Sequence, residues 1–202
     1  MLILNLPSEK IGAEMYELLT MANQTTEDVF SLLDNLLKWT KSQIGNLNVV
    51  YQDVDAVEVV DSVIDVFNMV AGLKKITIRE EKPEKLPVCT DIDMLKTIIR
   101  NLLSNAIKFS NENSEVLVKM EEQGDTVVVS VKDSGCGIDE EGQQKLLHTD
   151  THFSTFGTNN EEGSGLGLLL CQDFAVKSGG KLWFTSKKGE GSTFYFSIPL
   201  KK

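Results

Sequence analysis

Apolar residues recur at steps of mostly three and four through residues 8–44, a spacing that places them along one side of a helix. Ser8 can cap this helix, and Gly45-Asn46 breaks it. The recurring positions are Ile11, Met15, Leu18, Ala22, Val29, Leu33, Leu36 and Thr40. A helix of ~55 Å with such a seam cannot fold over a small core by itself. We therefore expect it to dimerise into a helical bundle; an ordinary core helix of the same domain is the alternative.

Beyond residue 45 the pattern alternates between strands and amphipathic helices. Helices are predicted over 55–72, 92–109, 139–147 and 164–177. Strands are predicted over 48–54, 75–80, 88–90, 115–121, 126–132, 181–186 and 192–199. Residues 148–163 are polar and lack periodicity, which predicts a flexible lid. The fold class is thus predicted as α+β, with a helical arm at 1–45 and a two-layer α/β sandwich at 46–202, a mixed sheet with helices on one face.

Composition indicates a globular protein and restricts its partners. The chain has 202 residues, of which 41% are hydrophobic, and a formal net charge of -10. That charge argues against nucleic acid as a partner, because phosphate binding needs a basic surface. No apolar run approaches the ~20 residues of a membrane span, and the apolar opening Met1–Leu4 is too short for a signal peptide. The three cysteines lie far apart, which indicates reduced thiols in a cytoplasmic protein. We expect no membrane contact by this chain itself, although it can be the cytoplasmic part of a membrane-anchored sensor.

The predicted helix 92–109 carries a polar face with candidate chemistry. Asn101, Asn105 and Lys108 follow one another at spacings of four and three, so they point the same way. An Asn carbonyl can bind Mg²⁺ without repelling a triphosphate, and Lys108 adds a positive charge. A solvated polar face is the alternative. The opposite, core face is predicted to consist of Leu95, Ile98, Ile99, Leu102, Leu103 and Ile107.

Asp133 ends a predicted strand and is followed by Ser134-Gly135-Cys136-Gly137-Ile138. Two glycines permit close approach of the backbone to a flat ligand, and the carboxylate can accept a hydrogen bond from an exocyclic amine, which would select adenine. An ordinary turn after a strand is the alternative.

The run Gly163-Ser164-Gly165-Leu166-Gly167 leads directly into an apolar helix. Bare backbone N–H groups at a helix start favour anions, so the run is similar to a phosphate loop. No Gly-Lys-Ser/Thr follows, so it is not a Walker motif.

In this order, the three clusters resemble the asparagine box and the two glycine boxes of the histidine-kinase ATP-binding domain. That domain belongs to the Bergerat-type fold group shared with gyrase, heat-shock chaperone and mismatch-repair ATPases. The resemblance covers about 46–202. The arm end Leu32–Thr40 is similar to the second helix of the kinase dimerisation domain, which favours the sensor-kinase branch over the other relatives.

The resemblance implies a complete site for the cofactors ATP and Mg²⁺. Asn105 would be the metal ligand, with Asn101 near the phosphates, Lys108 on a phosphate and Phe109 against the adenine or ribose. The adenine turn would consist of Asp133, Gly135, Gly137 and Ile138. The residues closing on the phosphates would be Gly163, Gly165, Leu166 and Gly167. Phe153 and Phe156 resemble the phenylalanine segment of the kinase lid.

The histidine that such kinases phosphorylate is not evident in this sequence. Its two histidines, His148 and His152, are not followed by an acidic residue and lie in or beside the lid. We therefore expect the acceptor helix to precede residue 1, so that 1–45 would be a partial dimerisation hairpin. Many ATPase relatives have a Glu one turn before the magnesium Asn, whereas position 101 is Asn, which argues against an ATPase.

The implied function is that of a protein histidine kinase of a two-component system, a homodimer that passes phosphate to the receiver domain of a response regulator. Two alternatives stay open at this point. One is a nucleotide-binding regulatory module that transfers no phosphate. The other is a serine kinase of the anti-sigma-factor type, which has the same fold and typically lacks the arm.

Overall fold

The computed structural model describes residues 48–147, 158 and 165–200, together with scattered positions between Met15 and Thr40. The chain divides into two units, 1–47 and 48–202. In the first unit every described position is helical, as predicted for the arm. Several of its apolar seam residues are 40–54% exposed, namely Met15, Val29, Leu33 and Leu36. The predicted lid, 148–163, lies outside the described residues apart from Thr158.

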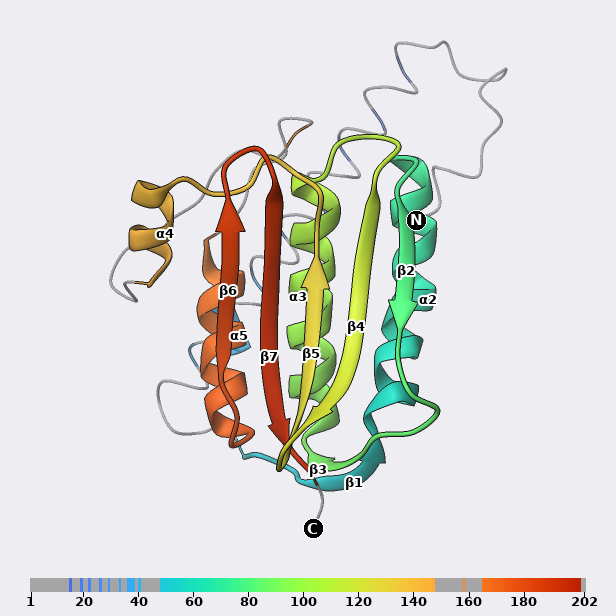
Figure 1. Ribbon diagram of the computed structural model, residues 1–202, viewed down its shortest axis with the longest axis vertical. Coiled ribbons are helices and arrows are strands. Elements are labelled where there is room, and N and C mark those ends of the chain that lie inside the picture. Colours follow the sequence, from blue (N-terminus) through green and yellow to red (C-terminus); the bar gives the residue numbers. More distant parts are fainter. Residues whose placement is uncertain are drawn as a thin grey trace. The chain divides into compact units, whose positions relative to one another are not determined.

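The second unit is built on a five-stranded mixed sheet with the strand order β2-β4-β5-β7-β6 (Figure 1). Its strands are β2 (Thr77–Glu81), β4 (Glu115–Gln123), β5 (Thr126–Lys132), β6 (Leu182–Lys187) and β7 (Gly191–Pro199). Strand β2 runs parallel to β4, and the other neighbouring strands are antiparallel. The predicted mixed sheet is therefore confirmed.

Two short strands form a separate ladder. Strands β1 (Gln52–Asp55) and β3 (Pro87–Thr90) pair antiparallel, and a single bridge joins Val88 to Leu200 beyond the end of β7. Both strands were predicted, although β1 begins at Gln52 and residues 48–51 of the predicted strand are not part of it. The pairing of the two strands with each other was not predicted.

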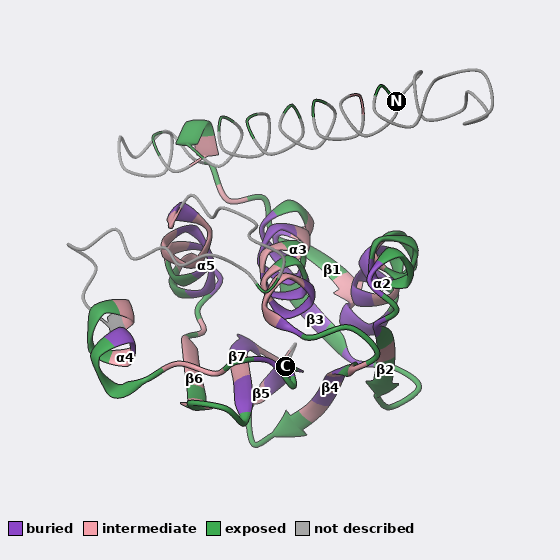
Figure 2. Cartoon of the chain, turned by 90° about the horizontal axis from the view of Figure 1, so that it is seen from above, coloured by how far each residue is buried: buried purple, intermediate pink, exposed green. Residues whose placement is uncertain are grey.

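Three helices cover one face of the main sheet, and their buried sides face it (Figure 2). They are α2 (Ala56–Leu73), α3 (Ile92–Phe109) and α5 (Leu166–Lys177). The short α4 (Glu140–Leu147) lies beyond the β6 edge. Strand side chains alternate, so Val127, Val129 and Val131 of β5 are buried on the helix side. This is the predicted two-layer sandwich.

Helix α3 is the central element of the helical layer. Its six predicted core residues are each no more than 6% exposed. Asp91 caps its start, because Oδ1 accepts hydrogen bonds from the backbone of Asp93 (2.9 Å) and Met94 (3.1 Å). Val50 donates its backbone N–H to the other Asp91 oxygen at 2.8 Å. These bonds fix the start of the helix, and burial of its core face turns the polar face away from the sheet.

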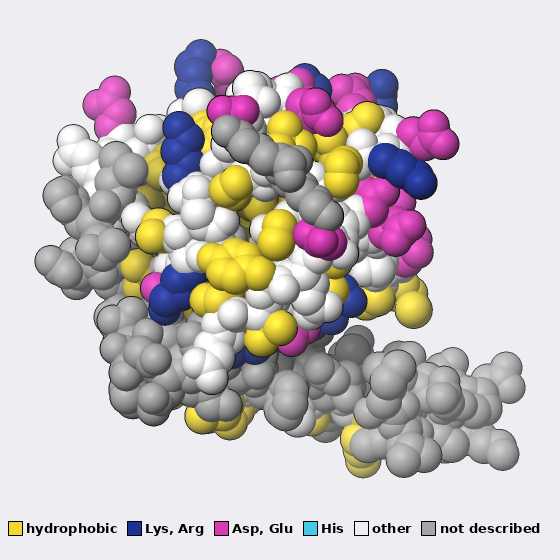
Figure 3. Space-filling model, turned by 90° about the horizontal axis from the view of Figure 1, so that it is seen from below, with side chains coloured by type: hydrophobic (Ala, Val, Ile, Leu, Met, Phe, Trp, Pro, Cys, Tyr) yellow, Lys and Arg dark blue, Asp and Glu magenta, His cyan; other side chains and the backbone are white. Residues whose placement is uncertain are grey.

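The distribution of charged side chains on one face of the protein fits the net negative charge of the chain. On the face shown in Figure 3, Lys and Arg side chains stand singly among acidic, apolar and uncharged ones. Among the described residues, no helix is long and apolar enough to cross a bilayer.

Candidate nucleotide-binding site

The carboxyl half of α3 presents the predicted polar face. Asn101, Asn105 and Lys108 are all half-buried, one turn apart along the helix. The Asn101 amide is oriented by its own helix, since Nδ2 donates to the carbonyl of Thr97 at 2.9 Å. The face therefore offers neutral amide oxygens and one ammonium, as the spacing predicted.

The start of α5 lies against this face. A β-carbon on Gly167 would stand 2.6 Å from Oδ1 of Asn101. Gly165, the N-cap, adopts a left-handed conformation with φ 68° and supplies no side-chain cap. The first turn of α5 also holds no acidic residue, while Leu166 is anchored in the core at 9% exposure. The N–H groups of this turn are thus suited to binding an anion beside the asparagines.

Asp133 lies buried at the end of β5, with 4% of its surface exposed. Its Oδ1 accepts hydrogen bonds from the backbone N–H of Gly135 (2.9 Å) and of Ser192 (3.1 Å). Burial raises the pKa of the Asp133 carboxyl, and hydrogen bonds from backbone N–H groups oppose that rise only in part. Since both bonds go to Oδ1, Oδ2 is the oxygen left to accept a hydrogen bond from a ligand.

The glycines after Asp133 are required by close contacts with the protein backbone. A β-carbon on Gly135 would stand 2.1 Å from the carbonyl oxygen of Phe109, and one on Gly137 would stand 2.0 Å from that of Lys187. Ile138 then donates its backbone N–H to Oγ of Ser186 at 2.8 Å. The turn is therefore packed between the end of α3 and the β6–β7 hairpin.

Gly191 and Ser192 contact Asp133, although no motif in the sequence marked them as site residues. A β-carbon on Gly191 would stand 2.2 Å from the Asp133 carbonyl oxygen, which explains why the chain has glycine there. Asp133 also donates its backbone N–H to the carbonyl of Ser192 at 2.9 Å. The turn Gly189-Glu190-Gly191 before an apolar strand was the available signal, but its position beside Asp133 depends on the pairing of β5 with β7.

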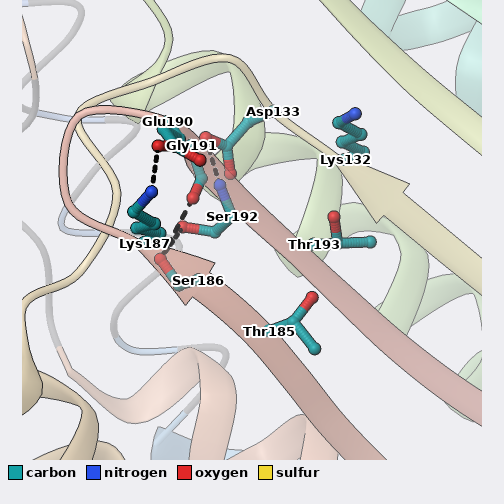
Figure 4. A pocket seen from close by; sticks show the side chains of 9 residues that line it. All are labelled: Lys132, Asp133, Thr185, Ser186, Lys187, Glu190, Gly191, Ser192 and Thr193. Carbon is teal, nitrogen blue, oxygen red and sulfur yellow. Dashed lines mark hydrogen bonds and ion pairs between the residues drawn. The ribbon is translucent and has the colours of Figure 1, made fainter.

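A shallow cavity opens beside Asp133 and Ser192 (Figure 4). Its volume is about 240 Å³, and its lining comes from the ends of β5, β6 and β7. It includes no residue of α3 or α5 and is smaller than the usual ligand pocket of roughly 300–1,000 Å³. We therefore do not equate it with the whole nucleotide pocket.

In the described part of the site, contacts join the three predicted clusters at two points. Asn101 and Gly167 are in contact range, Phe109 abuts Gly135, and Lys108 Nζ lies 5.2 Å from the Phe109 ring centroid. Other predicted residues lie outside the described part of the chain: Gly163, Phe153, Phe156, His148 and His152. The roles assigned to all of these residues stay predictions.

The residues present fit Mg²⁺ bound jointly with a nucleotide. The described residues contain no group of three or more His, Cys, Asp and Glu side chains that could hold a metal by themselves. Mg²⁺ instead prefers few protein oxygens together with waters and phosphates. The amide oxygen of Asn105 could supply the protein ligand in such a set. A metal here would therefore be expected with the nucleotide.

The chain belongs to the family of histidine kinase-, DNA gyrase B- and HSP90-like ATPases, whose sequence profile matches residues 90–202. That range runs from the last residue of β3 and includes α3, the Asp133 turn and α5. All three clusters that carried the predicted resemblance thus lie within the matched range.

Individual relatives are histidine kinases. The adaptive-response sensory kinase SasA of Crocosphaera subtropica is 29% identical over 196 residues, which are 96% of this chain and 51% of that kinase. The solved catalytic domain of the histidine kinase ThkA is 29% identical, with a TM-score of 0.65 over 75% of this chain and 96% of that one. The Acinetobacter baumannii histidine kinase AdeS shares the fold, with a TM-score of 0.72 at 20% identity over 92% of this chain and 85% of its own.

These matches confirm the predicted resemblance to the catalytic domain of sensor histidine kinases. The chain spans about half the length of the SasA kinase. What is known of whole kinases therefore enters only as a proposal.

Proposed function

We propose that this chain binds ATP together with Mg²⁺ and transfers the γ-phosphate to a histidine on a dimerisation helix, for relay to the receiver domain of a response regulator. One observation carries the proposal. The asparagine face of α3 meets the start of α5 at Asn101 and Gly167, and the end of the same helix meets the Asp133 turn at Phe109 and Gly135.

Asp133 supports adenine recognition at one end of the site. Its Oδ2 would accept a hydrogen bond from the exocyclic amine, and its Oδ1 is already held by the turn. A base presenting a carbonyl at that place, as guanine does, would lose this bond and face a carboxylate oxygen. Phe109 would pack against the adenine or ribose, and Gly135, Gly137 and Ile138 would shape the wall.

The phosphates would lie between α3 and α5. Lys108 and the N–H groups after Gly165 would bind phosphate oxygens, with Asn101 and Gly167 beside them, and Asn105 would ligate Mg²⁺. When bound, the metal would neutralise charge on the phosphates. Phosphoryl transfer needs mainly positioning and charge neutralisation, which these residues are suited to provide.

The histidine that accepts the phosphate is proposed to lie on a dimerisation helix, and not on any of the helices α2 to α5. Neither His148 nor His152 is followed by an acidic residue, as the acceptor of such kinases is. The exposed apolar seam of the arm supports assembly of two copies into a helical bundle, which would present that helix to the site.

Phosphotransfer distinguishes this proposal from the two alternatives. The chain would be fused to a dimerisation helix carrying a His-Glu pair and incubated with Mg²⁺ and γ-labelled ATP. A histidine kinase would give acid-labile, base-stable label on that helix, lost when the histidine is replaced by Gln. A serine kinase would give acid-stable label on a protein substrate, and a regulatory module would bind ATP without any transfer.

A further inference from the structure

Lys74 is a buried lysine at the carboxyl end of α2, with 8% of its surface exposed. It is the C-cap of that helix, and its backbone N–H donates to the carbonyls of Ala71 and Gly72. A lysine is seldom buried to this degree unless its ammonium is well hydrogen-bonded. The partners of the ammonium therefore indicate what the residue does.

The Lys74 ammonium binds the carboxyl end of α3. Nζ donates to the carbonyl oxygens of Ile107 (3.1 Å) and Lys108 (2.9 Å). Carbonyls in the last turn of a helix lack donors from their own helix and carry the negative end of its dipole, so an ammonium suits them.

Thr158 joins the same junction. Lys74 Nζ contacts Oγ1 of Thr158 at 2.6 Å, and the Thr158 backbone N–H donates to the Lys108 carbonyl at 3.1 Å. Oγ1 of Thr158 also donates to the Ser110 carbonyl at 2.8 Å. The main chain at Lys108 is thus held from two sides.

This end of α3 carries two of the residues proposed to contact the nucleotide, Lys108 and Phe109. The same end also contacts a third residue of the proposed site, Gly135, because the Phe109 carbonyl fills the space where a β-carbon of Gly135 would be. A shift of the last turn of α3 would therefore displace Lys108 and press against the turn that holds Asp133 (Figure 1 shows α2, α3 and β5 reaching the same end of the sheet).

We propose that Lys74 is a positioning residue of the nucleotide site, which holds the last turn of α3 so that Lys108 can reach the phosphates. Lys74 acts through Lys108 and does not itself touch the nucleotide. The inference rests on the proposed function, because it concerns the same site.

Three variants of the full 202-residue chain test it. Lys74→Met keeps the unbranched stem and removes all donors, whereas Lys74→Gln keeps an amide donor. Lys75→Met is the matched control, since the neighbouring Lys75 side chain is 68% exposed and pairs only loosely with Glu112 at 3.5 Å. The dissociation constant of Mg-ATP is measured by calorimetry, and thermal unfolding verifies that each variant is folded.

We expect Lys74→Met to weaken Mg-ATP binding about tenfold, Lys74→Gln to weaken it less, and Lys75→Met to leave it unchanged. A double-mutant cycle with Lys108→Ala separates positioning from general stability. In the Lys108→Ala background, Lys74→Met should cost less than about threefold, because the residue through which it acts is gone.

Each contrary result would overturn a specific claim. If the parent chain binds no Mg-ATP, the proposed function falls and the role of Lys74 falls with it. If the parent binds and folded Lys74→Met binds equally well, the Lys74 proposal alone is wrong. Full additivity with Lys108→Ala would also overturn it, in favour of a merely structural role. Should Lys74→Met fail to fold, Lys74→Gln decides the question in the same cycle.

Discussion

A β-carbon on Gly167 would stand 2.6 Å from Oδ1 of Asn101, so there is no room for a side chain between the start of α5 and the asparagine face of α3. The Asn101 amide cannot simply swing aside at no cost, because Nδ2 is hydrogen-bonded to the Thr97 carbonyl at 2.9 Å. Two clusters far apart in the sequence therefore lie side by side, as the proposed site requires.

Gly167→Ala should impair nucleotide binding without unfolding the protein. Alanine is preferred to glycine within a helix by about 1 kcal/mol, which offsets part of the strain. The added methyl must displace the Asn101 amide or the first turn of α5, so we expect Mg-ATP affinity to fall about fivefold or more with a nearly unchanged melting temperature. Calorimetric titration and thermal unfolding measure the two quantities.

Gly72→Ala provides the matched control for that change. Gly72 also lies in a helix, α2, but a β-carbon there would meet no atom within 4 Å. It should leave ATP affinity unchanged and stabilise the fold by up to about 1 kcal/mol. Unimpaired ATP binding by Gly167→Ala would show that the contact with Asn101 does not matter for the site.

Asp133→Asn should weaken binding of adenine nucleotides. The asparagine amide can still accept from Gly135 and Ser192, yet it would then present an N–H₂ donor to the exocyclic amine of adenine. Loss of a buried hydrogen bond costs about 1–3 kcal/mol, which is roughly a 5- to 150-fold loss of ATP affinity. Competition between ATP and GTP for a fluorescent nucleotide measures it, and an unchanged preference for ATP would contradict the role given to Asp133.

The same substitution should change how stability depends on pH. Burial raises the pKa of Asp133 in the folded state, so its contribution to stability is fully present below the unfolded pKa of about 4 and is lost as pH rises through the folded pKa. Asparagine does not titrate. The unfolding free energy of Asp133→Asn minus that of the parent should therefore be larger at pH 7 than at pH 4, as measured by urea denaturation. A difference that is constant or decreases with pH would exclude this effect of burial.

The cysteines should differ in reactivity. Cys89 and Cys136 are exposed, whereas Cys171 is buried in α5, where burial raises the pKa of its thiol. Iodoacetamide should therefore alkylate the first two and spare the third, as peptide mass spectrometry would report. Mg-ATP should slow the labelling of Cys136, which lies between Gly135 and Gly137, and leave Cys89 unaffected as the internal control. Equal labelling of Cys136 with and without nucleotide would argue against a ligand at this turn.

Local patterns in the sequence predicted most of the fold. Helix α3 is the clearest case, since Asp91 caps it and the apolar face read from its spacing is the face that is buried. Asp55 likewise caps α2, because Oδ1 accepts from the Val57 backbone at 3.0 Å. These features depend on residues near one another in the chain, which is why periodicity and capping sufficed.

Features that depend on distant pairing could not be predicted in this way. Alternating apolar residues marked β1 and β3 as strands but did not say that they pair with each other outside the main sheet. Ser192 reaches Asp133 only because β7 pairs with β5. Lys74 and Lys75 are identical neighbours in sequence, and only the position of the end of α3 decides that Lys74 is the buried one.

Titration of the chain with ATP in the presence and absence of Mg²⁺, for the parent and for Asn105→Ala, tests the central claim most directly. Asn105 is half-buried on a helix surface, so alanine should leave the fold intact. We predict that Mg²⁺ strengthens ATP binding by the parent and that Asn105→Ala both weakens binding and abolishes the effect of Mg²⁺. A parent chain that binds no ATP, or an Asn105→Ala variant that binds Mg-ATP as tightly as the parent, would contradict the account.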